Sequence, residues 1–352
     1  MQSNLTYNGN VKKVKVISVG VFSKATSIPG QGVGAAYIEQ LNLIQQSQQL
    51  NVVLKGTGKL DLIHIHTVNF RYWIAMLFIS IPKVVYVHFL PSTLGTSIKL
   101  PKIFFGILKW YIKMFYKTAS YLVVVNPIFI EPLVKMGIKR ERITFIPNFV
   151  DESKFTIPDS RAKVRKAWGV KRFTVFGVGQ VQHRKGVIDF VETAKKLPQL
   201  DFIWAGGFSF KGLTAGYEEL KNVMENPPAN VRFLGIIPRE RMKELYHACD
   251  LFFLPSYDEL MPMSVLEAAV CNKPILLRDL DLYQPVFHGQ YLSAHSVDGF
   301  VKIVKHLSED EQAYQQSLAH PTWLKAHYQR GAILKKWEDY YQEVLDQHAK
   351  TH

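Results

Sequence analysis

The sequence predicts an α/β fold of two Rossmann-like domains that face each other across a cleft. Short apolar strands alternate with helices over most of the chain, and the alternation restarts after residue 150. Each series contains a segment typical of anion binding at the carboxyl edge of a parallel sheet. The 352 residues are enough for two domains of ordinary size. We therefore place domains at residues 1–150 and 151–330, followed by a final helix at residues 331–352.

Charge is distributed unevenly between the two halves. Residues 1–150 carry 17 Lys and Arg against 4 Asp and Glu, whereas residues 151–352 carry 26 against 25. A cationic half suggests an anionic surface as partner, either lipid or nucleic acid. Two cysteines are too few for a disulfide framework and fit reduced thiols in the cytoplasm. We expect no signal peptide and no transmembrane segment, because the apolar runs are interrupted or shorter than the roughly 20 residues that a spanning helix needs.

The first domain is expected to open with a strand at residues 14–21, a glycine-rich turn at Pro29–Tyr37 and a helix to about residue 46. Glycines between a strand and a helix let backbone amides approach an anion. The plain alternative is a tight turn without a ligand, because short glycine patterns recur by chance.

Histidines occupy the next two predicted strands. His64 and His66 share one face of the strand Asp61–Thr67, and the strand Val84–His88 ends in a histidine. Structural or substrate-lining histidines are favoured over a metal site, because no third ligand is evident nearby. His88 is the preferred active-site histidine, with a buried core histidine as the alternative.

The helix predicted at residues 101–120 combines a lysine row with aromatic residues. Lys102, Lys109, Lys113 and Lys117 are spaced seven, four and four residues apart and share one face. Apolar side chains, among them Trp110, cover the other faces. An ordinary helix on a sheet explains part of this pattern, but its apolar arc is wider than one sheet face, so we favour a helix in a membrane interface. Each lysine near an anionic leaflet contributes about 1 kcal/mol.

The other predicted elements continue the alternation. The first domain adds a strand at 121–125, a helix at 127–136 and a strand at 143–146, followed by a linker to about residue 160. The second domain has strands at 173–178, 202–205, 231–234, 251–254 and 274–277, with helices at 187–197, 239–248 and 262–271. From residue 295 the chain is expected to be helical, at 296–307, 311–318 and 323–347, with a break near Gly331.

Two carboxylates stand on either side of the predicted helix start at Pro262. Glu259 lies in the loop after the strand 251–254, and Glu267 follows a little over one turn inside the helix. Helix amides that bind a diphosphate and carboxylates that bind hydroxyls would together suit a sugar nucleotide. The plain alternative is a loop charge and a solvent-facing helix residue.

This stretch resembles the E-x7-E signature of retaining glycosyltransferases of the GT-B fold, family 4 type. The signature is written P-S-x-x-E-G-F-G-x-x-x-x-E-A-M-A-x-G-x-P, and here it stands as P-S-Y-D-E-L-M-P-M-S-V-L-E-A-A-V-C-N-K-P. The resemblance assigns Glu259 to the donor sugar hydroxyls and Glu267 to the ribose. Leu260, Pro262 and Asn272 replace usual glycines. Since Pro262 has no amide, the phosphates would be bound by Met261, Met263 and Ser264.

Other motifs resemble the same family. G-Q-V-Q-H-R-K-G at residues 179–186 is similar to G-R-x-x-x-x-K-G, whose cations neutralise the leaving diphosphate. Lys185 matches, Gln180 takes the arginine position, and Arg184 would compensate. His88 corresponds to the family's strand-end histidine near the reacting carbon.

The family's glycine-rich loop faces the donor phosphates and the acceptor. This implies donor contacts for Gly32 and Gly34 and an acceptor contact for Gly30. In the family the last helix crosses back onto the first domain. D-L-D at residues 279–281 matches a metal motif of another glycosyltransferase fold, but we interpret it as coincidental.

The resemblance implies a retaining hexosyltransferase that uses UDP-glucose or UDP-galactose and requires no metal or other cofactor. G-Q-G-V-G-A-A-Y and Y-D-E-L-M-P-M are similar to bacterial synthases that add a second hexose to monoglycosyldiacylglycerol. The expected partners are the UDP-sugar, a glycolipid acceptor and an anionic membrane, without nucleic acid. The protein would be cytoplasmic and attached peripherally to the inner face of the cell membrane.

Two alternatives stay open. The same fold could glycosylate a polyprenyl-linked or soluble acceptor during capsule or surface polysaccharide assembly. In a different class, a basic protein with a degenerate site would bind membranes or nucleic acid without catalysis, and its binding would be sensitive to salt.

Overall fold

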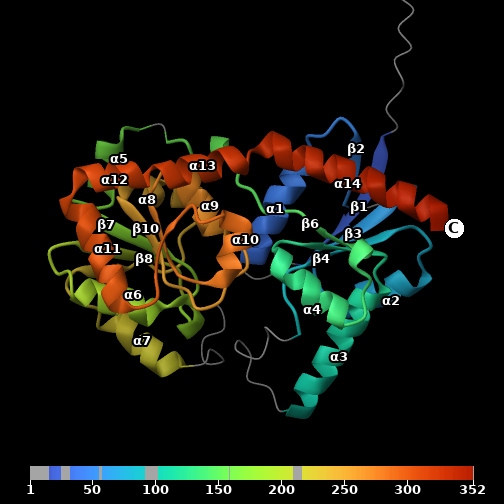
Figure 1. Cartoon of the computed structure of the whole chain (residues 1–352), viewed down its shortest axis with the longest axis horizontal. Coiled ribbons are helices and arrows are strands. Elements are labelled where there is room, and N and C mark those ends of the chain that lie inside the picture. The colour runs from blue at the N-terminus through green and yellow to red at the C-terminus, as the bar shows by residue number, and fades with distance from the viewer. Residues whose placement is uncertain are drawn as a thin grey trace, which may run out of the picture.

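The computed structural model describes residues 16–24, 32–54, 58–91, 102–157, 159–208 and 216–351. These residues form two α/β domains that lie side by side (Figure 1). Each domain is built on a parallel sheet of six described strands. The predicted fold class, two Rossmann-like domains, is confirmed.

The N-terminal domain arranges its strands in the order β2-β1-β3-β4-β5-β6. The strands are β1 (Ile17–Phe22), β2 (Leu50–Val53), β3 (Leu62–Ile65), β4 (Lys83–Val87), β5 (Tyr121–Val124) and β6 (Ile143–Phe145). The helices are α1 (Gly32–Ile44), α2 (Phe70–Phe78), α3 (Lys102–Thr118) and α4 (Ile130–Lys135), the last preceded by the 3-10 helix η3 (Pro127–Phe129). The chain changes direction across the sheet between β1 and β3, which makes their carboxyl ends a topological switch point.

The C-terminal domain has the strand order β12-β11-β10-β7-β8-β9. The strands are β7 (Thr174–Val178), β8 (Asp201–Ala205), β9 (Val231–Phe233), β10 (Leu251–Leu254), β11 (Ile275–Arg278) and β12 (Leu292–Ala294). The helices are α5 (Arg161–Ala167), α6 (Val187–Lys195), α7 (Tyr217–Glu225), α8 (Arg239–Ala248), α9 (Met263–Val270), α10 (Gln284–Phe287), α11 (Val297–Glu309), α12 (Glu311–Ser317), α13 (Ala319–His327) and α14 (Arg330–Thr351). Here the switch point lies between β7 and β10.

The central strands are apolar because both of their faces are covered. Every residue of β3, β10 and β11 is buried, which explains why these strands appear in the sequence as continuous rather than alternating apolar runs. Several helices begin at a polar cap. Asn69 Oδ1 accepts from the Arg71 N–H at 3.0 Å at the start of α2, and Asp310 Oδ1 accepts from the Ala313 N–H at 3.0 Å at the start of α12.

Helix α14 crosses from the C-terminal domain over the N-terminal domain, as predicted (Figure 1). Its Tyr341 hydroxyl lies 2.8 Å from His64 Nδ1, and its Glu338 accepts a hydrogen bond from Ser47 at 2.5 Å. The Trp337 ring is buried 5.3 Å from the His64 ring. The aromatic stripe of the last helix therefore packs against the N-terminal domain.

Several predicted boundaries were wrong, and six α-helices and β-strands were not predicted. The predicted strand ending at His88 stops at Val87, the helix at 127–136 begins as the 3-10 helix η3, and the break near Gly331 falls at residues 328–329. The elements without a prediction are β2, α2, α5, α7, α10 and β12. Strands β2 and β12 are short edge strands, and of the nine residues of α7 only Leu220 is buried. Such elements carry too little apolar periodicity to be recognised.

Candidate active site

The candidate site lies at the carboxyl ends of β7 and β10, where the C-terminal sheet has its switch point. Two loops leave this edge: the β7–α6 loop (residues 179–186) and the β10–α9 loop (residues 255–262). Gly186 has a φ of 70°, and a Cβ atom there would lie 2.2 Å from the Pro255 carbonyl oxygen. Only glycine fits this close approach. Gly186 therefore allows the β7–α6 loop, which contains Lys185, to pack directly against the β10–α9 loop.

Glu259 and Lys185 meet where the two loops touch. Lys185 Nζ contacts Glu259 Oε1, and the Ser256 hydroxyl donates to the same oxygen at 3.0 Å. The Glu259 and Lys185 side chains are 10% and 14% exposed, so solvent screens this pair weakly. Burial lowers the pKa of Lys185, and Glu259 acts in the opposite direction. The arrangement can present a cation and a carboxylate to one ligand.

Arg184 lies beside this pair, whereas Gln180 takes no part in it. Arg184 Nη1 is 3.9 Å from Glu259 Oε1 and donates to the Asp258 carbonyl oxygen at 3.2 Å. Gln180 directly follows Gly179 at the carboxyl end of β7. A second cation is thus available at this edge from Arg184, the residue that the sequence analysis offered as compensation for Gln180.

Glu267 is buried in α9, so the alternative of a solvent-facing residue was wrong. It accepts from the Tyr246 hydroxyl at 2.8 Å and from Arg239 Nη1 at 3.0 Å. The other terminal nitrogen of Arg239 donates at 3.1 Å to Glu39, a buried carboxylate of α1 that also pairs with Lys154 at 2.9 Å. One guanidinium therefore joins a carboxylate of each domain.

Replacing Glu267 with alanine is expected to destabilise the protein by about 1–3 kcal/mol, because the Tyr246 hydroxyl and one limb of Arg239 lose their acceptor. Urea unfolding would measure this change. Glu218→Ala, at an exposed position of α7, is the control and is expected to stay within about 0.5 kcal/mol of the original protein. Equal stability of the two variants would contradict the role given to the buried carboxylate.

Three histidines gather below the carboxyl edge of the N-terminal sheet. The His64 and His66 rings are 4.4 Å apart, and the His66 and His88 rings are 6.0 Å apart. Burial lowers the pKa of His64 to about 3 and that of His88 to about 4, and it also lowers the pKa of His66. All three are therefore neutral near pH 7. Across the described ranges, no three His, Cys, Asp or Glu side chains are placed to hold a metal ion.

These neutral histidines predict an acid-sensitive fold. The unfolded chain takes up protons at the ordinary histidine pKa of about 6.5, but the folded chain binds them only near pH 4 or below. Their contribution to stability is thus complete above about pH 6.5 and falls with decreasing pH, by about 1.4 kcal/mol per pH unit for each histidine. Urea unfolding between pH 7.5 and 5 would show the loss. A free energy of unfolding that stays constant over this range would contradict it.

The predicted glycine-rich turn ends earlier than expected. Gly32 is the first residue of α1 and Gly34 lies in its first turn, so the prediction that they form a loop before the helix was wrong. Their placement keeps them at the helix N-terminus, where free amides favour anions. Gly30 lies outside the described residues.

Helix α9 also begins at the site. Its N-cap is Pro262, which makes no side-chain capping bond to the first turn. The amides at the start of a helix have no partner within it, and those of Met263 and Ser264 belong to this first turn. Met261 is buried just before the cap.

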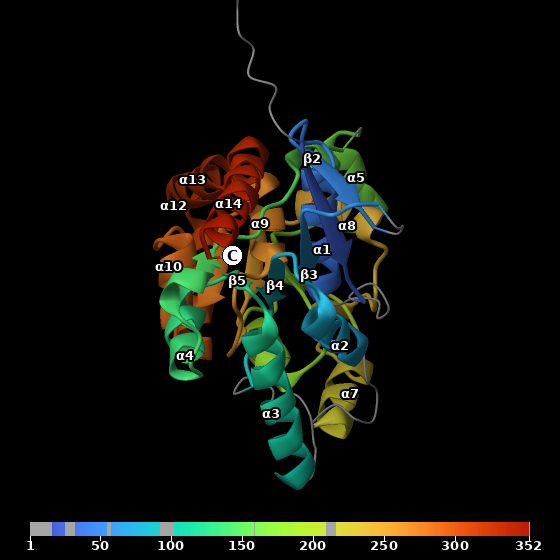
Figure 2. The same ribbon diagram turned by 90° about the vertical axis from the view of Figure 1, so that its right-hand side faces the viewer.

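An apolar surface lies on α2 and α3, away from the sheet. Helix α3 projects from the body of the molecule beside α2 (Figure 2). Trp73 of α2 and Trp110 of α3 pack with their rings 6.1 Å apart. The apolar residues of these two helices that are exposed by 55% or more are Phe70, Leu77, Phe78, Ile103, Phe104, Ile107 and Trp110. With the exposed Lys109, Lys113 and Lys117 they form what we name the α2–α3 surface.

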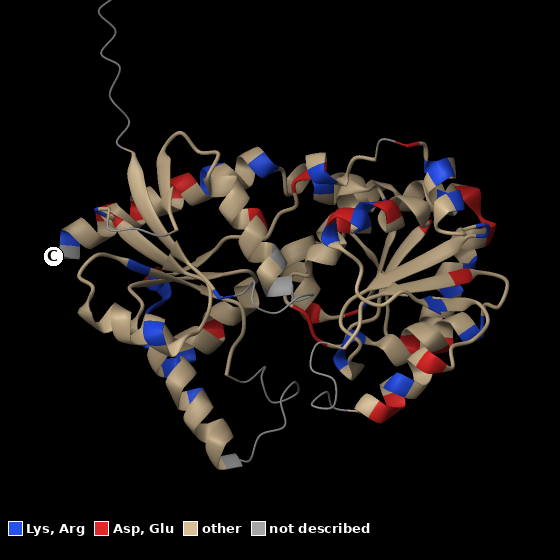
Figure 3. Ribbon diagram, turned by 180° about the vertical axis from the view of Figure 1, so that it is seen from behind, with Lys and Arg blue, Asp and Glu red and all other residues tan. Residues whose placement is uncertain are grey.

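The charges of the α2–α3 surface are all of one sign. Lysines follow the projecting helix, whereas both signs mix on the C-terminal domain (Figure 3). The Lys102 backbone opens α3, but its side chain lies outside the described part. Among the described helices, none is long and apolar enough to cross a membrane.

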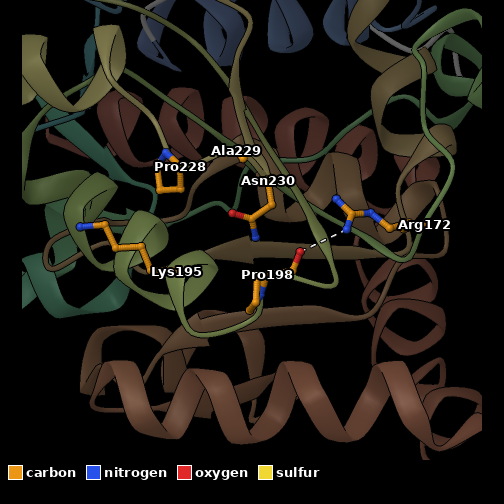
Figure 4. Close-up of a pocket in the computed structure, with 6 residues that line it drawn as sticks. All are labelled: Arg172, Lys195, Pro198, Pro228, Ala229 and Asn230. Carbon is orange, nitrogen blue, oxygen red and sulfur yellow. Dashed lines mark hydrogen bonds between the residues drawn. The ribbon is translucent and has the colours of Figure 1, made fainter.

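A shallow pocket on the C-terminal domain contains none of the predicted site residues (Figure 4). Its polar side chains are already engaged. Asn230 donates to the carbonyl oxygens of Ala194, Leu197 and Leu200, and Arg172 donates to that of Pro198 at 3.1 Å. We assign no ligand to it.

Five side chains support the site from a distance and were not predicted from the sequence to do so. They are Glu39, Asn126, Asn148, Arg239 and Tyr246. Each is tied to the site by a contact across 21 to 200 residues of sequence, so no spacing within one motif could reveal it.

Comparison with known proteins gives matches over most of the chain. The model described as Glycosyltransferase Family 4 matches residues 28–154, and the model described as Glycosyl transferases group 1 matches residues 160–317. An alpha-galactosylglucosyldiacylglycerol synthase of Streptococcus pneumoniae is 42% identical over 95% of this chain and 91% of its own length. A processive diacylglycerol alpha-glucosyltransferase of Acholeplasma laidlawii is 31% identical over 39% of this chain and 41% of its own.

Solved structures share the fold at low identity. HepE of Anabaena, in complex with UDP-glucose, aligns with a TM-score of 0.76 at 17% identity over 93% of this chain and all of its own. WaaG, a glycosyltransferase involved in lipopolysaccharide biosynthesis, aligns with a TM-score of 0.65 at 14% identity over 92% of this chain and 99% of its own.

Proposed function

This chain belongs to the glycosyltransferase family that those two models describe, and from this premise we propose a retaining hexosyltransferase acting on a membrane glycolipid. The donor would be UDP-glucose or UDP-galactose, and the acceptor a lipid such as monoglucosyldiacylglycerol. The contact between Lys185 and Glu259 at the C-terminal switch point carries the proposal. The 42% identity to a synthase of this kind supports the choice of acceptor.

The donor would bind between the two loops with its diphosphate toward the cations. Lys185, Arg184 and the amides of Met261, Met263 and Ser264 would stabilise the charge that develops on the departing UDP. Glu267 would accept from the ribose hydroxyls. Because side-chain cations and amides can balance the diphosphate, the proposal includes no metal ion.

Transfer would occur on one face of the donor sugar. The bond from the anomeric carbon to the phosphate oxygen breaks, the acceptor oxygen bonds to the same face, and the departing phosphate oxygen takes the acceptor proton. Glu259 and the neutral His88 would position the sugar, without forming a covalent intermediate.

The α2–α3 surface would attach the enzyme to the inner face of the cell membrane. Aromatic and aliphatic side chains beside lysines suit the boundary between head groups and acyl chains, where apolar burial and attraction to anionic lipid add together. The surface belongs to the half of the chain that carries 17 basic against 4 acidic residues. A peripheral enzyme at this boundary reaches a sugar that projects from the bilayer.

One experiment tests donor, acceptor and membrane together. The full chain would be incubated with labelled UDP-glucose or UDP-galactose and vesicles of anionic lipid containing monoglucosyldiacylglycerol. We expect transfer of one hexose with an α linkage, and none without the glycolipid. Equal transfer to a soluble or polyprenyl-linked acceptor would instead favour polysaccharide assembly. Vesicle binding without any transfer would favour the non-catalytic alternative.

A further inference from the structure

Asn126 of the N-terminal domain holds the main chain of the β10–α9 loop. It follows β5 at the carboxyl edge of the N-terminal sheet and is completely buried. Its side-chain nitrogen donates to the carbonyl oxygens of Leu260 at 2.7 Å and Leu282 at 2.8 Å. Its side-chain oxygen accepts from the Ile128 N–H at 3.1 Å. Both N–H groups of the side-chain amide therefore donate to carbonyl oxygens of the C-terminal domain.

A second asparagine, Asn148, forms hydrogen bonds with Met261, the next residue of the same loop. Asn148 Nδ2 donates to the Met261 carbonyl oxygen at 3.1 Å, and its main-chain N–H lies 3.3 Å from the Met261 sulfur. The Tyr86 hydroxyl lies 3.5 Å from Asn148 Oδ1. Two successive carbonyls of the β10–α9 loop thus point toward the N-terminal domain.

Because the peptide bond is planar, the hydrogen bond from Asn126 to the Leu260 carbonyl oxygen also sets the direction of the Met261 N–H. In a trans peptide the C=O of one residue and the N–H of the next point in opposite directions. With the Leu260 carbonyl turned to Asn126, the Met261 N–H points away from it. No hydrogen bond among the described residues uses that N–H. The following peptide has no N–H, because residue 262 is proline.

We propose that Asn126 is a positioning residue for the donor diphosphate, because it turns the Leu260–Met261 peptide so that the Met261 amide is presented to a phosphate oxygen. The proposal rests on the proposed function. It gives the N-terminal domain an indirect part in phosphate binding, because Asn126 orients a peptide of the other domain and does not itself contact the nucleotide. It also adds one amide donor at a loop where Pro262 removes another.

The first test replaces Asn126 with aspartate or serine. Either residue can still accept from the Ile128 N–H, but aspartate loses both donors and serine retains one at most. We expect UDP to bind about tenfold more weakly, equivalent to about 1.4 kcal/mol, because the Leu260–Met261 peptide loses the hydrogen bond that holds it. Uridine, which has no phosphate, should bind as before. Weaker binding of both ligands would point to a general loss of structure and would overturn the proposal.

Asn69→Asp is the matched control. Asn69 caps α2 with the same extended backbone and the same acceptor role, at 3.0 Å from the Arg71 N–H. UDP binding by this variant is expected to equal that of the unchanged protein. All titrations would omit vesicles, so that membrane contact does not affect them.

A second test observes UDP binding to the unchanged protein and does not depend on how the Asn126 variants fold. Selective 15N labelling of the 8 methionines gives a small set of amide signals, and Met261→Leu identifies one of them. UDP should shift the Met261 signal and uridine should not. A signal unmoved by bound UDP would overturn the positioning role while leaving the proposed function intact. A protein that bound no UDP would overturn the proposed function itself.

Discussion

Replacing Glu259 with glutamine is expected to lower kcat by about a hundredfold, the size of effect found when one preorganised hydrogen-bonding group is removed from an active site. The two side chains have the same shape, but the amide has no charge to set against Lys185 and Arg184. Lys185 and the Ser256 hydroxyl both donate to Oε1, so the amide oxygen of glutamine can keep these two contacts while the negative charge is lost. Steady-state transfer to the glycolipid would measure kcat and the KM for the UDP-sugar.

Glu309→Gln is the control for this change, since Glu309 is exposed at the end of α11. Its kcat should equal that of the unchanged enzyme. Circular dichroism would check that Glu259→Gln is folded. If a folded Glu259→Gln enzyme kept full transfer activity, Glu259 would have no part in catalysis. The interpretation of the β10–α9 loop as part of the donor site would then be wrong.

Reversing Lys109 and Lys113 to glutamate should weaken binding to anionic vesicles by about a thousandfold. The two reversals change the charge of the α2–α3 surface by four units, at about 1 kcal/mol for each unit near an anionic leaflet. Both lysines are exposed on α3, and Lys109 Nζ lies only over the Phe105 ring, 4.5 Å from its centroid. Vesicle flotation at fixed salt would measure the partition.

Lys302 and Lys305 provide a matched pair on α11 of the other domain. They are exposed, and their reversal makes the same change in net charge. If vesicle binding depends on where the lysines lie, the Lys302 and Lys305 double variant should keep most of its binding. Equal losses in both double variants would show that net charge alone drives attachment, which contradicts a defined membrane face. UDP binding in the absence of vesicles should be unchanged in both.

Part of the site could be predicted from residues that are close together in the sequence. The apolar run Leu251–Leu254 and the helix Arg239–Ala248 were predicted with the bounds that the structure has. Parallel strands place their carboxyl ends at one edge, so the loops that contain Lys185 and Glu259 could be expected to meet there. The observed contact between Lys185 and Glu259 follows from this arrangement of the strands.

Long-range contacts made the rest unpredictable. Arg239 pairs with Glu39 across 200 residues, and Asn126 reaches Leu260 across 134. Neither arginine at a helix start nor asparagine after a strand is unusual in a sequence. Their roles follow from the docking of one domain against the other, which no periodicity encodes. For the same reason a solvent-facing Glu267 stayed open as an alternative, although Tyr246 and Arg239 of α8 bind its carboxylate.

The sequence by itself determined the two-domain α/β fold, the two loops at the switch point of the second sheet and the lysine-rich helix, because each depends on side chains that are neighbours along the chain. Only the tertiary structure decided which charges are paired, which carbonyls of the β10–α9 loop bond to the other domain and which apolar residues of α2 join α3 in one exposed surface. Those features depend on how separate elements pack, and packing acts on side chains that can be hundreds of residues apart.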